Sequence, residues 1–193
     1  MNFLAHLLLA GRDPHLLVGN FIADHVKGRK IEDYPERIQY GIRMHRAIDS
    51  FTDQNPIVRK SVLRLRPVYS KYSGVIVDMY YDHFLALHWS HYCKESLLSF
   101  TTSSYAILKE HSEYLPARSL RTLTYMSADN WLMAYATLDG MQQAFNGMSR
   151  RTVFASGMEN AVTDLVRNYP SYREEFNEYF PELQQFVESS FEK

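Results

Sequence analysis

The sequence contains a single cysteine, Cys93, and no long hydrophobic run. One cysteine excludes an internal disulfide and a cysteine-rich zinc site. No stretch approaches the ~20 apolar residues that a membrane-spanning helix needs. The apolar N-terminal segment lacks the basic residues and the cleavage site of a secretory signal. We therefore expect a cytoplasmic protein that does not associate with a membrane.

Motifs that identify several common enzyme classes are also missing. The sequence has no glycine-rich loop for nucleotide phosphates, no His-Glu-x-x-His pair and no Gly-x-Ser-x-Gly nucleophile. The formal net charge is only −1, so we expect no nucleic-acid partner. Residues 26–71 depart from this balance, with 11 Lys and Arg against 5 Asp and Glu. Such a local excess is typical of a solvated surface or of one that attracts an acidic partner.

The abundant residues favour an all-α protein. Hydrophobic residues make up 46% of the 193 residues, enough for a sizeable core. Helical periodicity dominates, and Asp13-Pro14, Asp33-x-Pro35 and Asn55-Pro56 are typical helix starts. We expect one helical bundle domain spanning residues 1–193. The sequence predicts helices near 2–10, 14–26, 35–53, 56–66, 69–90, 95–112, 117–136, 138–148, 156–168 and 171–190.

Histidine and aspartate recur on helices in the first half of the chain. Residues four apart share one face of a helix. Two rows of such residues are His45, Asp49 and Asp53, and Asp78 and Asp82. His83 follows Asp82 and is turned from it by about 100°.

Two further ionisable residues stand alone in apolar segments, His6 in NFLAHLLLA and Asp24 at the end of LLVGNFIAD. Burying a carboxylate or an imidazole is costly unless a partner compensates it. A single such residue is most often satisfied within the core, and acids four apart also form ordinary surface pairs. Four helices that each bring His or Asp also fit a divalent cation held inside a helical bundle. The spacing alone leaves both interpretations open.

Four sequence blocks resemble the signature blocks of the acyl carrier protein phosphodiesterases, also called acyl carrier protein hydrolases. They are MNFLAHLLLA, GNFIADHVKG, GIRMHRAIDSFTDQNPIVR and DMYYDHFLALHW, which cover most of residues 1–90 in the family's order. LMAYATLDGMQQAFNGMSRR, residues 132–151, is similar to the family's later helix. The resemblance implies an all-α fold distantly related to the HD-domain phosphohydrolases. The pair Asp82-His83 reverses the His-Asp order of typical HD proteins.

The resemblance also implies an activity. Members of this family hydrolyse the phosphodiester that joins 4′-phosphopantetheine to holo-acyl carrier protein, which leaves apo-acyl carrier protein. The expected cofactor is manganese (Mn2+), with Mg2+, Fe2+ or Co2+ as other divalent candidates. The expected partner is holo-acyl carrier protein.

Site residues carry over from the resemblance position by position. The expected metal ligands are His6, Asp24, His45, Asp82 and His83. Asp49 and Asp78 are expected to position or deprotonate the attacking water, and Asp53 to orient a ligating histidine. Arg43 and Arg46 flank His45 and are candidates for binding phosphate oxygens.

The basic excess has a candidate purpose, because acyl carrier proteins are acidic. It predicts a docking surface made of Arg29, Lys30, Arg59, Lys60, Arg64 and Arg66. Two other functions remain open. One is an HD-like metal phosphohydrolase that acts on a nucleotide or another small phosphoester. The other is a non-catalytic helical binding protein whose His and Asp residues are structural.

Overall fold

The computed structural model describes residues 1–191, and this part of the chain contains helices and no strands. The all-α prediction is therefore confirmed. The first five α-helices are α1 (Phe3–Ala10), α2 (Pro14–Ile22), α3 (Glu36–Gln54), α4 (Pro56–Tyr69) and α5 (Ser73–Leu87). The others are α6 (Leu97–Glu110), α7 (Ala117–Ala128), α8 (Trp131–Ala134), α9 (Leu138–Ser149), α10 (Ala161–Arg167) and α11 (Tyr169–Ser190). The 3-10 helices are η1 (Ala23–His25), η2 (Gly28–Asp33), η3 (Ser70–Tyr72), η4 (Trp89–His91), η5 (Ser112–Tyr114) and η6 (Met158–Asn160).

Two helix starts have the capping geometry that the sequence predicts. The Asp13 carboxylate accepts hydrogen bonds from the backbone N–H groups of His15 and Leu16, at 2.9 and 3.0 Å. Asn55 accepts one from Ile57 N–H at 2.9 Å. In each case a proline follows the cap, where its missing N–H costs nothing. α2 and α4 therefore begin where we expect them.

Some predicted helices are interrupted. The expected helix 117–136 breaks at Asn130, whose φ of 44° is left-handed, so that α7 and α8 are separate. The expected helix 69–90 begins only at Ser73, because Ser70 also has a positive φ and η3 intervenes. A break of one or two residues hardly alters the period of the apolar positions, so the pattern does not reveal it.

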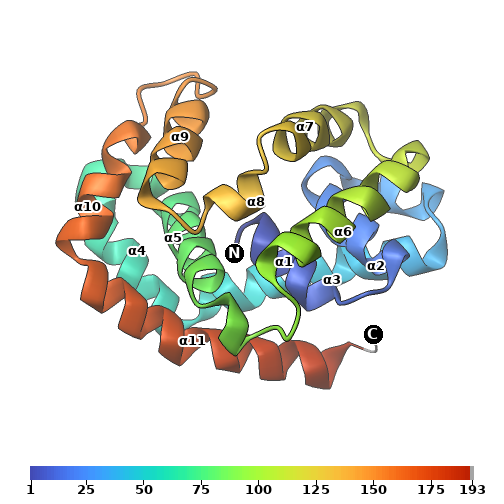
Figure 1. Ribbon diagram of the computed structural model, residues 1–193, viewed down its shortest axis with the longest axis horizontal. Coiled ribbons are helices and arrows are strands. Elements are labelled where there is room, and N and C mark those ends of the chain that lie inside the picture. The colour runs from blue at the N-terminus through green and yellow to red at the C-terminus, as the bar shows by residue number, and fades with distance from the viewer. Residues whose placement is uncertain (192–193) are drawn as a thin grey trace.

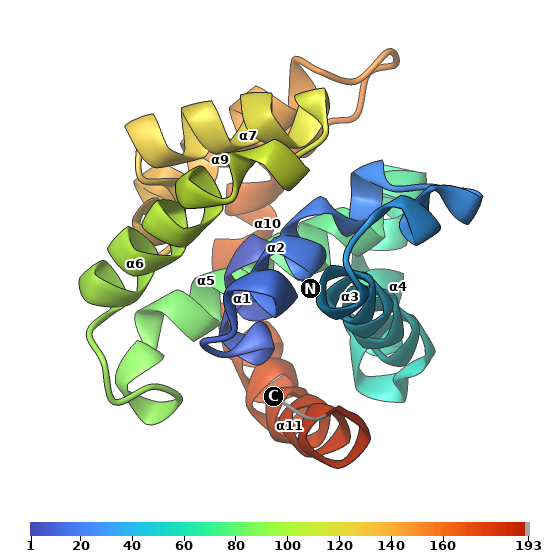
Figure 2. The same cartoon turned by 90° about the vertical axis from the view of Figure 1, so that its right-hand side faces the viewer.

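α1 lies in the middle of the molecule and contacts α2, α3 and α5. α11 runs along one side and packs against α3, α4 and α5, while α7, α8 and α9 lie on the opposite side (Figure 1). Figure 2 shows α3 and α4 side by side, next to the start of α1. The N-terminus therefore lies among α1, α3 and α5, which carry most of the predicted site residues.

α2 and α3 cross in backbone contact. A Cβ on Gly19 would lie 2.3 Å from the carbonyl oxygen of Ile38, and one on Gly41 would lie 2.6 Å from that of Leu16. No side chain fits at either distance, so both positions require glycine. Asn20 follows Gly19 on α2, and His45 lies one turn after Gly41 on α3. The crossing therefore fixes the position of Asn20 relative to His45.

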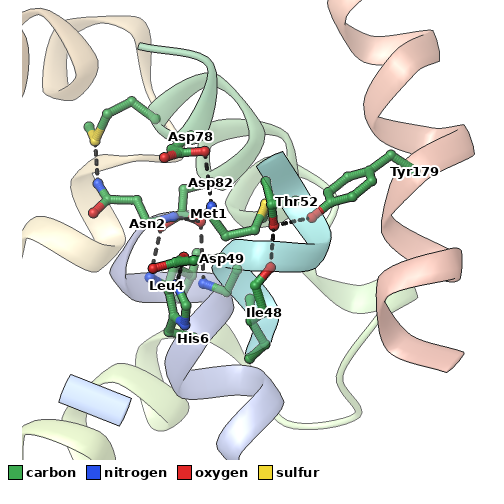
Figure 3. Close-up of polar contacts among 12 residues, drawn as sticks. Met1, Asn2, Leu4, His6, Ile48, Asp49, Thr52, Asp78, Asp82 and Tyr179 are labelled. Atoms are coloured by element: carbon green, nitrogen blue, oxygen red, sulfur yellow. Dashed lines mark hydrogen bonds and ion pairs between the residues drawn. The ribbon is translucent and has the colours of Figure 1, made fainter. Parts of the chain in front are cut away.

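Buried polar contacts attach α11 to the rest of the bundle. The Thr52 hydroxyl lies 2.6 Å from the Tyr179 hydroxyl and donates to the carbonyl of Ile48 (Figure 3). Glu175 is 4% exposed and accepts two hydrogen bonds from Arg64, at 2.6 and 2.8 Å. Arg64 is thus committed to a structural ion pair, which weakens its assignment to the predicted docking surface.

Candidate functional site

Two histidines from different helices stack at the floor of a cavity. His6 on α1 and His45 on α3 have ring centroids 3.9 Å apart and are 4% and 7% exposed. The Asp49 carboxylate lies between their Nε2 atoms, at 3.1 Å from each. Asp49 is one turn after His45 on α3, as the four-residue spacing predicts, and it lies beside His6 in Figure 3.

The cavity above these rings has a volume of about 260 Å³ and acidic walls. Four carboxylates line it: Asp24, Asp49, Asp53 and Asp78. Met1 also lines it, and the Met1 ammonium group donates to Asp78 Oδ1 at 2.9 Å. Burial, and then the charges of Asp78 and Asp49, raise the pKa of Asp53. Carboxylates this close destabilise one another in the ionised form, and a bound cation removes that cost.

The His6 ring is oriented by Asn20, a buried residue of α2. His6 Nδ1 lies 3.2 Å from Asn20 Oδ1, an acceptor, so Nδ1–H is the donor. Burial, and then the charge of His45, lower the pKa of His6 to about 4, so the ring is neutral near pH 7. Nε2 then presents a lone pair to Asp49 Oδ1, itself an acceptor. Two hydrogen-bond acceptors that are only 3.1 Å apart repel each other unless a cation or a proton lies between them.

His45 has the opposite charge state. Burial lowers its pKa, but the nearby carboxylates of Asp24 and Asp49 outweigh this effect and raise the pKa to about 9. Its Nε2 lies 3.1 Å from Asp49 and 3.4 Å from Asp24. Neither of its ring nitrogens has a partner in hydrogen-bonding geometry among residues 1–191. A buried nitrogen that faces two carboxylates without a hydrogen bond is suited to a cation placed between them.

These residues fit a divalent cation. One atom each from His6, His45 and Asp49 lie within 4.8 Å of one another, and Asp24 approaches from η1. Imidazole and carboxylate are ligands for Mn2+, Fe2+ and Zn2+. The hydrogen bond from His6 to Asn20 is the kind of outer contact that fixes a ligating histidine.

Asp82 lies elsewhere, at the start of α1. It is fully buried and accepts hydrogen bonds from the backbone N–H groups of Leu4 at 2.8 Å and of Asn2 and Ala5 at 3.3 Å (Figure 3). Burial raises its pKa to about 7, although these donors act in the opposite direction. Asp82 does not line the acidic cavity. The structure therefore places it as the cap of α1 rather than with the metal ligands that we expected it to join.

His83 is also separate from the cluster. Its Nδ1 lies 2.7 Å from the carbonyl oxygen of Tyr135, and its Nε2 lies 3.0 Å from the Tyr169 hydroxyl. Both ring nitrogens thus have partners within the core. The turn of about 100° per residue directs His83 away from Asp82, and α5 presents only Asp78 of these three residues to the cavity.

The remaining predicted residues surround the cluster or point away from it. Asp53 and Asp78 line the cavity, but no hydrogen bond or ion pair within residues 1–191 joins Asp53 to a histidine that it could orient. Arg43 is exposed and lies 3.5 Å from Gln39 Oε1, so it faces solvent. Arg46 donates to the Val26 carbonyl at 2.7 Å, which holds the segment after η1. Neither arginine lines the cavity.

Sequence reasoning missed two groups at this site. Asn20 is the only polar residue within LLVGNFI, and that isolation was a usable signal. The Met1 ammonium group had no signal in the sequence, because only the fold brings it to Asp78.

The fold and the site define an all-helical protein with a His–Asp cluster in an acidic cavity. The family model of the acyl carrier protein phosphodiesterases matches residues 1–183. The chain is 32% identical over 187 residues to the acyl carrier protein phosphodiesterase of Enterobacter sp. (strain 638), which covers 95% of each chain. It is 30% identical over 190 residues to that of Photorhabdus laumondii, with 98% of this chain and 96% of the relative covered. The chain therefore belongs to the acyl carrier protein phosphodiesterase family, as the sequence blocks predict.

No solved structure matches the chain, so the predicted relationship to HD-domain proteins stays a prediction. Within residues 1–191, none of the helices combines the length and the apolar character needed to cross a membrane.

Proposed function

We propose that this chain hydrolyses the phosphodiester between 4′-phosphopantetheine and the serine of holo-acyl carrier protein, with a divalent cation as cofactor. The observation that carries the proposal is the convergence of His6, His45 and Asp49 at the floor of an acidic cavity. Family membership over residues 1–183 supports the choice of substrate. The products are apo-acyl carrier protein and 4′-phosphopantetheine.

The chain's own residues hold and orient the reacting groups. His6 Nε2, His45 Nε2 and the Asp49 carboxylate form the cation site, and Asp24 closes it from η1. The cation, with Mn2+ as the first candidate, supplies positive charge against the phosphate oxygens and acidifies water. Asn20 keeps the His6 lone pair directed into the cavity. Asp82 and His83 have no place in this assignment.

Proton transfer is assigned to Asp53. Both oxygens of Asp49 face histidines, and Asp78 is bound by the Met1 ammonium group. Asp53 is the cavity carboxylate with no hydrogen-bond or ion-pair partner in the described part of the chain, and its pKa is raised. A carboxyl group with a raised pKa suits exchange of a proton with the attacking water or with the departing serine oxygen. This assignment revises the expectation for Asp49 and Asp78.

Docking of the acidic carrier protein is assigned to exposed cations on η2 and α4, which both pack against α3. Arg29, Lys30, Arg59, Lys60 and Arg66 are all exposed. Arg64 is left out because it is half-buried and makes two hydrogen bonds to Glu175, whereas Lys60 stays exposed although its Nζ lies 3.4 Å from the same carboxylate. Opposite charges steer encounter and raise the association rate.

The test is the mass of holo-acyl carrier protein after incubation with the protein and Mn2+, with and without EDTA. We expect loss of the phosphopantetheinyl group with Mn2+ only. Asp49→Asn should abolish this loss, and Asp139→Asn, an exposed acid on α9 outside the cavity, should not change it. If Mn2+, Mg2+, Fe2+ and Co2+ all fail to support the loss, the proposed function is wrong. A panel of nucleotides would then test the alternative phosphohydrolase activity.

A further inference from the structure

A second cavity adjoins the acidic one. It has a volume of about 310 Å³ and is bounded by the start of α1, by Met79 of α5 and by residues of α8 and α9. Asn2 and Phe3 line both cavities. The two cavities are therefore neighbours, and a molecule whose phosphate lies above the histidines would reach the second cavity by passing Asn2 and Phe3.

The walls of the second cavity combine apolar and polar side chains. Phe3, Met79, Trp131 and Met148 supply apolar surface. The polar groups are Asn2, Asp129, Gln143 and Arg151, and the Arg151 guanidinium lies 5.8 Å from the centre of the Trp131 ring. The volume and the mixed lining are within the range of small-molecule sites, about 300–1,000 Å³ with a few placed polar groups.

Asn2 stands at the junction of the two cavities. Its backbone N–H donates to Asp82, which holds the residue in place. Its side chain points away from Asp49 in Figure 3, and its amide donates to Met79 Sδ. The side-chain amide of Asn2 therefore lies beside Met79 of the second cavity. The His–Asp cluster lies on the other side of Asn2.

We propose that this second cavity binds the pantetheine portion of the substrate while its phosphodiester occupies the acidic cavity. The inference rests on the proposed function. Pantetheine carries a dimethyl-substituted carbon, a hydroxyl, two amides and a terminal thiol, so it alternates apolar and hydrogen-bonding groups along its length. Met79 and Trp131 suit the apolar parts, and Asn2 and Gln143 suit the amides. A simple acyl chain would offer no hydrogen-bonding group to Gln143 or Arg151.

Two glycines of α9, Gly140 and Gly147, line this cavity. They differ in the space that an added side chain would find. A Cβ on Gly140 would lie 2.0 Å from the carbonyl oxygen of Ala134, so Gly140 is required for the contact between α8 and α9. A Cβ on Gly147 would meet no atom within 4 Å. Packing of the helices thus leaves position 147 free to carry a side chain. A residue introduced there enters the cavity without displacing the fold.

The experiment compares Gly147→Leu with Gly74→Leu. Gly74 is also a half-buried helical glycine with no atom within 4 Å of an added Cβ, and it lines neither cavity. Both changes replace glycine by a better helix former, so neither variant should melt below the wild type. Binding of pantetheine is measured by saturation-transfer NMR in EDTA, so that no metal is needed. KM for holo-acyl carrier protein and hydrolysis of bis(p-nitrophenyl) phosphate are measured with Mn2+.

We expect Gly147→Leu to weaken pantetheine binding at least tenfold and to raise KM for holo-acyl carrier protein by a similar factor. Hydrolysis of the small diester and Mn2+ binding should stay unchanged, and Gly74→Leu should match the wild type throughout. Unchanged pantetheine binding in Gly147→Leu, or no pantetheine binding by the wild type, overturns the inference. An effect on long-chain acylated carrier protein alone would also overturn it, because the cavity would then hold the acyl chain. Pantetheine binding that depends on position 147, without any conversion of holo-carrier protein, would leave this site standing and refute the proposed function.

Discussion

Replacing Asp82 by alanine should destabilise the protein while leaving the proposed metal ligands in place. The Asp82 carboxylate accepts three backbone hydrogen bonds at the first turn of α1, and its side chain is fully buried. Loss of a helix cap costs about 0.5–2 kcal/mol, and a buried donor without an acceptor costs about 1–3 kcal/mol. Two of the three contacts are long at 3.3 Å, so each contributes less than a hydrogen bond of ordinary length. We therefore expect a loss of about 2–4 kcal/mol for Asp82→Ala. Asp82→Asn keeps one acceptor oxygen and should lose about half as much.

Urea unfolding followed by circular dichroism measures the loss of stability, and titration of Mn2+ against the folded protein measures the ligand role. Asp49→Ala is the matched change, because it removes a carboxylate from the cluster. We expect Asp49→Ala to lose most Mn2+ affinity and Asp82→Asn to keep it. The reasoning is refuted if Asp82→Asn folds with wild-type stability yet binds Mn2+ more than tenfold more weakly. Asp82 would then be a ligand, as we first expected from the sequence.

Three further outcomes follow from the geometry. Asn20→Leu should fold but weaken Mn2+ binding about 10–100-fold in a metal titration, because His6 loses the partner that directs its lone pair. Mn2+ affinity should rise about tenfold per pH unit below pH 9, because His45, with a pKa of about 9, must release its proton to bind a metal; a pH-independent affinity would contradict this. Glu175→Gln should cost about 1.5–3 kcal/mol in urea unfolding at pH 7, because the half-buried Arg64 loses its charged partner. Burial raises the pKa of Glu175, but Arg64 and Ser61 outweigh it, so the folded pKa is below the ordinary 4.5. The stabilisation is therefore complete above pH 4.5 and lost as pH falls through the folded pKa, and the difference between variant and wild type should shrink on acidification.

Part of the site could be predicted from the sequence because it depends on local geometry. His45 and Asp49 are four residues apart on one helix, so any α3 that buries His45 also brings Asp49 beside it. His6 was identifiable as a lone polar group in an apolar segment. The contact between His6 and His45, however, depends on how α1 and α3 pack, and no spacing within one helix specifies that.

The two predicted metal ligands that the structure places away from the cluster, Asp82 and His83, both lie on α5. Asp78 and Asp82 share a face by spacing, yet one meets the Met1 ammonium group and the other meets the first turn of α1. The two environments are a single helical turn apart. The position of the start of α1 decides which of the two acids faces the cavity. That position depends on how the helices pack, and not on the local sequence. The family's pattern places both acids in the same block and cannot separate their roles.

The glycine crossing of α2 and α3 also bears on how the site would respond to the proposed cation. Helices in backbone contact at Gly19 and Gly41 have no side-chain layer between them that could repack. Asn20 and His45 are carried on opposite members of this rigid pair, and the His6 ring lies against both. The proposed ligand atoms therefore already lie in position, and binding of the proposed cation would need little reorganisation of the backbone. Metal exchange in such a protein is expected to be limited by access through the acidic cavity rather than by refolding.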